Sequence, residues 1–472
     1  MSNYSRLGKN TLLVFVGKLG SSIIGFLMLP LYTRWLGVDA FGTSDLIMVY
    51  SSFLITLVTC GITGAVFVFP KDKSKIIQTS YYSSALSFIL KMFMLTAIIF
   101  VFIQLIARIL YLNNSFIDNL WLIYLVVISN SLQQFSQEFT RSIDKMIVFS
   151  LTGLVNTSLI AVFAFLFIPN WGLKGYVWSI SLASIVSAAY SFFASKTYQF
   201  IDYTMLSKKL TVAMLRYSLP LMPNQIMWWL VSSLNRPLME LHLGIHEIGI
   251  FAVANRFPAI ITMVFGVFAT SWQISVLEEF GREGYTTFYN NVFKIVFSIL
   301  LLILIGLTLS SKLIVEIFAG SDFIDAWHYI PLLGLGVVFS SISTFCGINF
   351  TATRESKYFF YSCALGAITS IILNIFLIPL LGTYGTCIAL VFSFLSMTLC
   401  RLYFSWKYVR IYKPSTYLGL LFAAVMIIVF YIIEVPLFIS FVLSFVYVVA
   451  ICYLNRRSAY LLFNITILRF RK

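Results

Sequence analysis

The chain has 472 residues, of which 60% are hydrophobic and only 10% are charged. A soluble domain carries roughly 25% charged residues, so this composition excludes a protein whose surface is covered by water. The net charge of +15 favours basic loops on one side of a membrane over nucleic-acid binding, because Lys and Arg gather in cytoplasmic loops.

The six cysteines fall in apolar segments without a CxxC pair, and the three histidines lie near expected loops. This distribution predicts neither a disulfide framework nor a metal site. The chain also lacks a phosphate-binding loop, a dinucleotide-binding glycine motif and zinc spacing. No loop is long enough to form a catalytic domain, so we expect no cofactor and no enzymatic activity.

A membrane-spanning helix needs about 20 mostly apolar residues, and the sequence predicts fourteen such segments. In chain order they are residues 10–35, 41–69, 80–106, 118–143, 146–168, 173–195, 213–236, 247–276, 291–318, 328–352, 358–380, 384–404, 416–433 and 436–454. We expect the first of these to stay in the membrane as an anchor rather than to be cleaved.

The loop charges predict the orientation of these helices. If the N-terminus is cytoplasmic, most of the 32 basic residues fall on the inner side, and few fall outside. The sequence therefore predicts a multi-pass membrane protein with both termini in the cytoplasm.

Two stretches of the sequence recur in the second half of the chain. PLYTRWLGVDAFG, from Pro30, matches PLMELHLGIHEIG, from Pro237, and IPNWGLKG, from Ile168, matches IPLLGTYG, from Ile378. Each match joins helices of equal rank, six helices apart, which predicts a parallel repeat about an axis along the membrane normal. Chance recurrence of small residues and proline at helix ends is the competing explanation.

The repeat predicts an all-α membrane fold of two parallel six-helix bundles followed by two more helices. The expected parts are an N-lobe over residues 1–205, a C-lobe over 206–412, and a final helix pair with a basic cytoplasmic tail over 413–472.

Polar groups inside a membrane are costly, and each is a candidate for function. Lys18 lies near the middle of the first segment, on a small polar face with Ser21, Ser22 and Gly25. This face is predicted to line a cavity; snorkelling of the lysine to the interface, or a packing seam, is the alternative. In the repeat, Gln225 occupies the position of Lys18.

The seventh segment carries Gln225, Trp229, Ser232 and Arg236 at helical spacing. Arg236 is near the expected outer end, where an interfacial anchor is the alternative to a binding role. Arg256 is expected about 13 Å into the next helix, at 1.5 Å per residue. We predict that Arg256 lines the cavity beside Asn255, rather than pairing with an acid.

Two further groups stand out. The fourth segment carries a polar stripe of Asn130, Gln133, Gln134, Gln137, Glu138 and Arg141. The stripe is predicted to line an inward vestibule. Equally, Glu138 and Arg141 could form a local ion pair along the helix. Lys91, in the third segment, is expected to be buried.

Together these side chains predict an electropositive cavity. Lys18, Lys91 and Arg256 are expected inside, Arg34 and Arg236 near the outer mouth, and few carboxylates lie at the same depth. Such a cavity attracts an anion such as a diphosphate, which Lys binds as a point charge and Arg binds as a fork.

The segments KLGSSIIGFLMLPLYTRWLGVDAFGTSDL and PLMPNQIMWWLVSSLNRPLMELHLGIHEIGIFAVANRF resemble Wzx-type flippases of lipid-linked oligosaccharides. These belong to the multidrug/oligosaccharidyl-lipid/polysaccharide (MOP) exporter superfamily, whose fold includes the MATE transporters. The resemblance implies translocation of undecaprenyl-diphosphate-linked sugar units, such as O-antigen or capsule repeats, to the outer leaflet by alternating access. It assigns Lys18, Arg34, Arg236 and Arg256 to the substrate.

The resemblance also implies partners: the lipid-linked oligosaccharide, membrane lipid, a coupling H⁺ or Na⁺, and polysaccharide polymerase or chain-length proteins. Relatives often carry an acid where this chain has Asn235, which weakens proton coupling at that point. A flippase for a peptidoglycan precursor would need the same kind of cationic site, so it remains an alternative. A cation-coupled drug exporter is disfavoured by Lys18 in the first helix, and a membrane glycosyltransferase or polymerase by the short outer loops.

Overall fold

A computed structural model describes residue 17 and residues 20–112 and 114–470, without side chains for Leu437 and residues 457–470. The described residues form helices and turns and no strand. Ten of the helices are long and apolar enough to cross a membrane. The predicted all-α, polytopic fold is therefore confirmed, and the chain is a multi-pass membrane protein.

The chain divides into two compact units, which are described separately. Unit 1 comprises Met1–Trp229 and Gly244–Gly249. Residues 20–27 are helical, and the following elements are α2 (Leu29–Thr59), α3 (Ile62–Val68), α4 (Lys75–Ile109), α5 (Ser115–Asp118), α6 (Leu120–Ser142), α7 (Met146–Ala194), η1 (Thr197–Phe200), η2 (Tyr203–Met205), α8 (Lys208–Ser218), η3 (Leu219–Leu221) and α9 (Met222–Ser232).

Unit 2 comprises Leu230–Leu243 and Ile250–Lys472. Its elements are α10 (Asn235–His242), α11 (Ile245–Arg256), α12 (Ala259–Glu279), α13 (Tyr285–Phe318), η4 (Ser321–His328), α14 (Ile330–Ala352), α15 (Lys357–Leu381), α16 (Thr383–Ser405), α17 (Pro414–Ile432) and α18 (Leu437–Phe470). The first residues of α11 belong to unit 1. Helix α14 is largely buried and packs against α12, α13 and α16.

Several expected helices are joined without a loop. The segments 146–168 and 173–195 form the single element α7, which is broken only by the non-helical backbone of Gly172 (φ 50°, ψ −127°). Similarly, α2 begins in the first expected segment and runs through the non-helical Gly37 (φ 69°) into the second expected segment. Glycine is suited to both positions because a positive φ costs it no Cβ clash.

The predicted repeat is visible in the backbone. Gly382 (φ 59°, ψ −137°) stands at the position of Gly172 in the repeat and has nearly the same dihedral angles. Three residues later, a Cβ added to Gly175 would overlap the carbonyl oxygen of Phe167, and one added to Gly385 would overlap that of Leu377. The same turn is thus built twice, from the same glycines.

A close helix crossing in unit 1 joins the other repeated stretch to its copy. A Cβ on Gly42 would overlap the carbonyl oxygen of Ile245, and a Cβ on Gly249 would overlap that of Val38. These contacts are reciprocal, since Gly249 and Ile245 occupy the repeat positions of Gly42 and Val38. Backbones can approach this closely in a membrane only where side chains are absent.

The division into units differs from the one expected at residue 205. The turns η1 and η2 and helix α8 stay with unit 1 because they are hydrogen-bonded to α4: Ser80 donates to the carbonyl of Met205, and the backbone N–H of Ser207 donates to Ser84. That the first copy of the repeat ends at residue 205 and the second begins at residue 206 stays a prediction.

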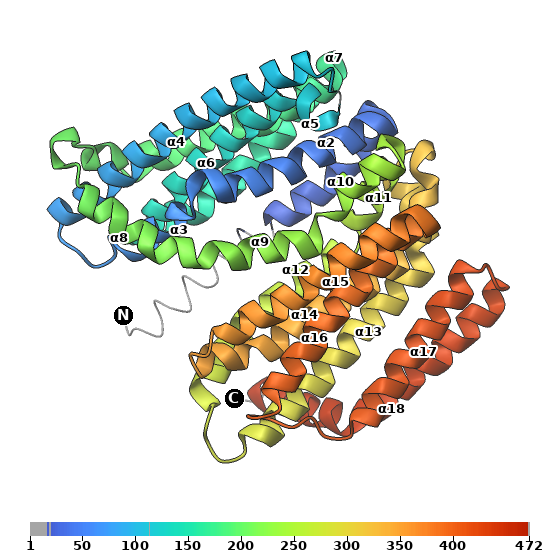
Figure 1. The fold of residues 1–472 in the computed structure, drawn as a ribbon. Helices are drawn as coiled ribbons and strands as arrows, with labels where there is room; N and C mark the ends of the chain where they lie inside the picture. The colour runs from blue at the N-terminus through green and yellow to red at the C-terminus, as the bar shows by residue number, and fades with distance from the viewer. Residues whose placement is uncertain (1–16, 18–19, 113, 471–472) are drawn as a thin grey trace. The chain divides into compact units, whose positions relative to one another are not determined.

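The last two helices belong to unit 2. Figure 1 shows α17 and α18 as a hairpin, and both pack on α13. The contacts are polar as well as apolar: Asn455 donates to Ser298 on α13 at 2.8 Å, and Ser311 donates to the Tyr431 hydroxyl at 3.3 Å.

The glycine crossing gives a stability prediction. Gly249→Ala should lower the thermal unfolding midpoint of the purified protein by several degrees, because the added methyl group must separate two backbones, at a cost of about 1–3 kcal/mol. Gly266→Ala, on α12, is the matched control, since nothing lies within 4 Å of its Cβ position. Equal midpoints for the two variants would contradict a tight crossing.

Candidate functional site

The first predicted cation, Lys18, lies outside the described residues. The described helix that follows, residues 20–27, packs against α7: Ser21 donates to the carbonyl of Gly153 at 3.2 Å, and a Cβ on Gly20 would lie 2.7 Å from the side chain of Leu154. Ser22 and Gly25 are exposed. The small residues therefore serve partly as a packing seam, and the role of Lys18 stays a prediction.

The polar stripe of α6 is divided between packing and exposure. Gln133 donates to Gln137 at 2.9 Å, and Gln137 donates to the carbonyl of Phe149 on α7 at 3.0 Å. Nearer the N-terminus of the same helix, Asn130 accepts a hydrogen bond from Ser184 of α7 at 2.8 Å. These amides join α6 to α7, as polar side chains commonly do between membrane helices, while Gln134 is exposed.

Glu138 and Arg141 form the local pair that was the alternative explanation. Arg141 Nη1 lies 3.5 Å from Glu138 Oε2, and its guanidinium stacks on the ring of Phe67, 4.0 Å from the centroid. Both side chains are only partly buried. Whether they also line a vestibule stays a prediction.

The expectation that Lys91 is buried is wrong. Lys91 is exposed on α4, in a stripe with Met94, Leu95 and Ile98, which are also exposed. The buried face of α4 carries Ile89, Phe93 and other residues instead, because the helical period places them on the opposite side.

The expected seventh helix is interrupted between α9 and α10. Pro237 has no N–H to donate to the carbonyl of Ser233, so the backbone tightens and Arg236 N–H bonds that carbonyl at 3.2 Å. The carbonyl of Ser232 then lacks its usual backbone donor. Arg236 supplies one from its side chain: Nη1 lies 2.6 Å from Ser232 O.

Arg236 is therefore buried, although the sequence placed it at the outer mouth. Its side chain is 5% exposed. It also donates to Asn235 Oδ1 at 3.0 Å and lies over the ring of Phe251, 4.9 Å from the centroid. These partners give Arg236 a structural role as the cap of a broken helix, which sequence reasoning missed.

The break also separates the face that was expected on one helix. Trp229 and Gln225 belong to unit 1. Trp229 donates its indole N–H to the carbonyl of Val49 at 3.2 Å and packs on Phe53, while Gln225 is exposed. The binding role of Gln225 stays a prediction.

The next expected helix is also interrupted, and Arg256 is the last residue of its first part, α11. Pro258 removes the N–H that would continue the helix, and α12 begins at Ala259. Arg256 is exposed and Asn255 is half-buried. Within the described chain, no hydrogen bond or ion pair holds either side chain, so the guanidinium is available to a ligand. Broken helices of this kind form substrate sites in transporters.

Arg34 has a similar environment in unit 1. It is exposed on α2, one turn before the bend at Gly37, and has no hydrogen bond or ion pair to another described residue. Among the described residues, Arg34 and Arg256 thus have no hydrogen-bonded or ionic side-chain partner, whereas Arg236 and Arg141 have partners.

One buried cation was not selected from the sequence. Arg401, at the end of the expected segment 384–404, lies on α16, and its side chain is only 4% exposed. It donates to the Ser343 carbonyl at 3.1 Å and to the Ser362 hydroxyl at 2.9 Å. Its place at the end of an apolar segment was the available signal, and it was interpreted as the start of a loop.

Residues 7–273 match the family described as Polysaccharide biosynthesis protein. The chain belongs to this family. Comparison with curated protein sequences gives no match.

Solved structures show the same fold. The chain is similar to the lipid II flippase MurJ in an inward closed conformation, with 17% identity, a TM-score of 0.70, and coverage of 95% of this chain and 100% of that one. It is also similar to a MOP superfamily transporter from Pyrococcus furiosus (14%, TM-score 0.60) and to an inward-facing MATE multidrug transporter (15%, TM-score 0.59). These two matches cover 84% of this chain and 94% and 93% of theirs.

The fold agrees with the resemblance to the MOP superfamily, to which two of these neighbours are assigned. The family and these neighbours also agree with the prediction that the chain is not an enzyme, since the neighbours are flippases and transporters. At these identities the structural matches establish the fold, and the substrate is a separate question.

The two arginines at the helix breaks should differ in their effect on stability. Arg236→Ala leaves the Ser232 carbonyl and the Asn235 amide oxygen without their donor, at a cost of about 1–3 kcal/mol. Arg256→Ala removes an unpaired, exposed side chain and should leave the thermal unfolding midpoint nearly unchanged. The midpoints of both purified variants test this difference; the opposite order would contradict the assigned cap.

Proposed function

We propose that the protein is a flippase that moves undecaprenyl-diphosphate-linked oligosaccharide units from the cytoplasmic to the outer leaflet of the inner membrane. It would supply the synthesis of a surface polysaccharide such as O-antigen, capsule or exopolysaccharide. The membership in the polysaccharide biosynthesis family and the flippase-like fold support this function.

The observation that carries the proposal is the unpaired guanidinium of Arg256 at the break between α11 and α12. An uncompensated cation in a membrane segment is costly, and a diphosphate offers it a charge-assisted, bidentate partner. Lys18 and Arg34 are proposed to contribute further positive charge, with Gln225 and Asn255 binding the sugar. The two lobes would alternate access to this site.

A peptidoglycan-precursor flippase is the second candidate, favoured by the likeness to a lipid II flippase. Both cargoes share the polyprenyl diphosphate, so the proposed cationic site serves either. Coupling to H⁺ or Na⁺, and association with polymerase or chain-length proteins, are proposals that extend the same scheme.

The test is flipping by purified protein in vesicles that contain a fluorescent undecaprenyl-diphosphate oligosaccharide. Arg256→Ala should lower the rate about tenfold or more, because one charge-assisted hydrogen bond contributes about 1.5–3 kcal/mol. The double variant that adds Lys18→Ala should abolish flipping, and Arg256→Lys should retain part of it.

Arg108→Ala is the matched control, since Arg108 is also an exposed arginine in the last turn of a helix. Unchanged flipping in the double variant would refute the cationic site. A faster rate with lipid II than with oligosaccharide carriers would favour the second candidate, and transfer of sugar to an acceptor would indicate a glycosyltransferase instead.

A further inference from the structure

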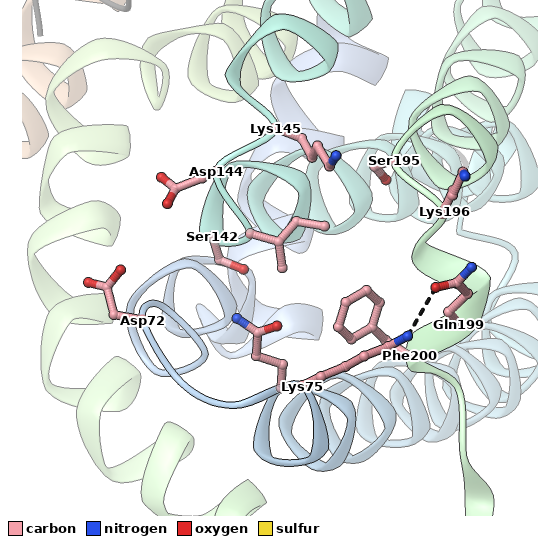
Figure 2. Close-up of a pocket in the computed structure, with 11 residues that line it drawn as sticks. Asp72, Lys75, Ser142, Asp144, Lys145, Ser195, Lys196, Gln199 and Phe200 are labelled. Atoms are coloured by element: carbon pink, nitrogen blue, oxygen red, sulfur yellow. Dashed lines mark hydrogen bonds between the residues drawn. The ribbon is translucent and has the colours of Figure 1, made fainter. Parts of the chain in front are cut away.

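A second cationic site lies at the loop end of unit 1, apart from the residues discussed above. Three connections meet there, α3–α4, α6–α7 and α7–η1, around a cavity of about 380 Å³. Figure 2 shows the side chains that line it. The loop charges assign this end to the cytoplasm.

Three lysines line the cavity: Lys75 at the start of α4, Lys145 before α7, and Lys196 after α7. Lys75 donates to Gln199 at 3.0 Å. The side chains of Lys145 and Lys196 make no hydrogen bond or ion pair with any other residue that the structure describes. Two ammonium groups are therefore uncompensated at the same opening.

The helices add to this positive charge. Lys75 is the first residue of α4, and Lys145 is the N-cap of α7. A helix N-terminus carries a partial positive charge, so it favours an anion and disfavours a lysine. An anion in the cavity would relieve the repulsion at both helix ends.

The two carboxylates that line the cavity lie on one side of it, and the described residues place no carboxylate on the opposite side. Asp72 and Asp144 also line it, but Figure 2 shows them on the side away from Lys196 and Gln199. An anion bound between the lysines would keep its negative charge away from these two groups.

Exposed apolar residues lie next to the lysines in the sequence or within three positions of them. Ile76, Ile147 and Phe193 are exposed close in sequence to Lys75, Lys145 and Lys196, with 69%, 55% and 65% of their surfaces accessible. Lysines flanked by exposed apolar residues are typical of a membrane interface. The phosphate groups present at such an interface are those of lipid headgroups.

The corresponding end of unit 2 has a different, more aromatic lining. Its cavity is lined by Tyr358, Tyr403, Phe404, Trp406, Lys407 and Arg410. There Lys407 lies 4.0 Å from Glu355, so a carboxylate of the protein already faces a lysine. At the corresponding place in unit 1, the described residues provide no such carboxylate partner for Lys145 or Lys196.

We propose that the cavity lined by Lys75, Lys145 and Lys196 binds the phosphate group of a membrane lipid. Two lipids carry this chemistry: an anionic phospholipid of the inner leaflet, and the polyprenyl diphosphate of the proposed cargo. The site is distinct from Arg256 and does not depend on the proposed function.

Native mass spectrometry of the delipidated, purified protein tests the proposal. The probes are phosphatidylglycerol, undecaprenyl diphosphate, phosphatidylcholine and inorganic phosphate. The Lys145→Gln/Lys196→Asn variant should bind the first or the second probe about thirtyfold more weakly than the unmodified protein, since each of the two lysines near a lipid phosphate contributes about 1 kcal/mol. Asparagine suits position 196, where φ is 58°.

Lys73→Gln/Lys209→Gln is the charge-matched control, because neither residue lines the cavity. Equal losses in the two double variants would overturn the site, as would equal binding by all variants. The lipid whose binding is lost identifies the source of the phosphate, and competition by inorganic phosphate at equal concentration would overturn the lipid assignment.

If the double variant does not fold, Lys196→Asn alone gives the same comparison with Lys209→Gln. Flipping by Arg256 variants is measured separately, so failure of one proposal leaves the other standing.

Discussion

Inside a membrane, a helix that stops must find a partner for each backbone group it releases, and this chain interrupts two of its expected helices at prolines. At Pro237 the released carbonyl is that of Ser232, and the Arg236 side chain supplies the missing donor. At Pro258 the helix ends on Arg256, whose guanidinium stays exposed. Two similar interruptions thus give two different arginines, one that holds the fold and one that is available to a ligand.

The repeat explains where such differences arise. Gly172 and Gly382 keep the same backbone turn in both copies, because the turn needs a residue without a Cβ. Side chains were free to diverge around that shared backbone. Ser191 donates to the carbonyl of Ser136, whereas Arg401 donates to the carbonyl of Ser343, the corresponding group of the second copy. A buried arginine has replaced a serine there without an acidic partner within hydrogen-bonding reach among the described residues.

The proposed function and the proposed lipid site use the same chemistry at different places. Both bind phosphate with cations that lack a carboxylate partner in the described chain: Arg256 at a helix break, and Lys145 and Lys196 at a loop end. A polyprenyl diphosphate presents both an anion and a lipid chain, so one cargo is suited to each environment. Protein that binds this cargo at the loop end would also hold it near the leaflet from which transport is proposed to begin.

The sequence by itself determined the membrane fold, the order of the helices and the internal repeat, because hydropathy, proline and glycine act through local physics. It also selected Arg256 as an exceptional cation. Only the tertiary structure decided which polar residues are engaged: Gln137 joins α6 to α7, Arg236 caps a broken helix, Lys91 is exposed and Arg401 is buried. Whether a side chain packs, pairs or stays free depends on the neighbouring helix, and the spacing of residues along one helix carries no information about that neighbour.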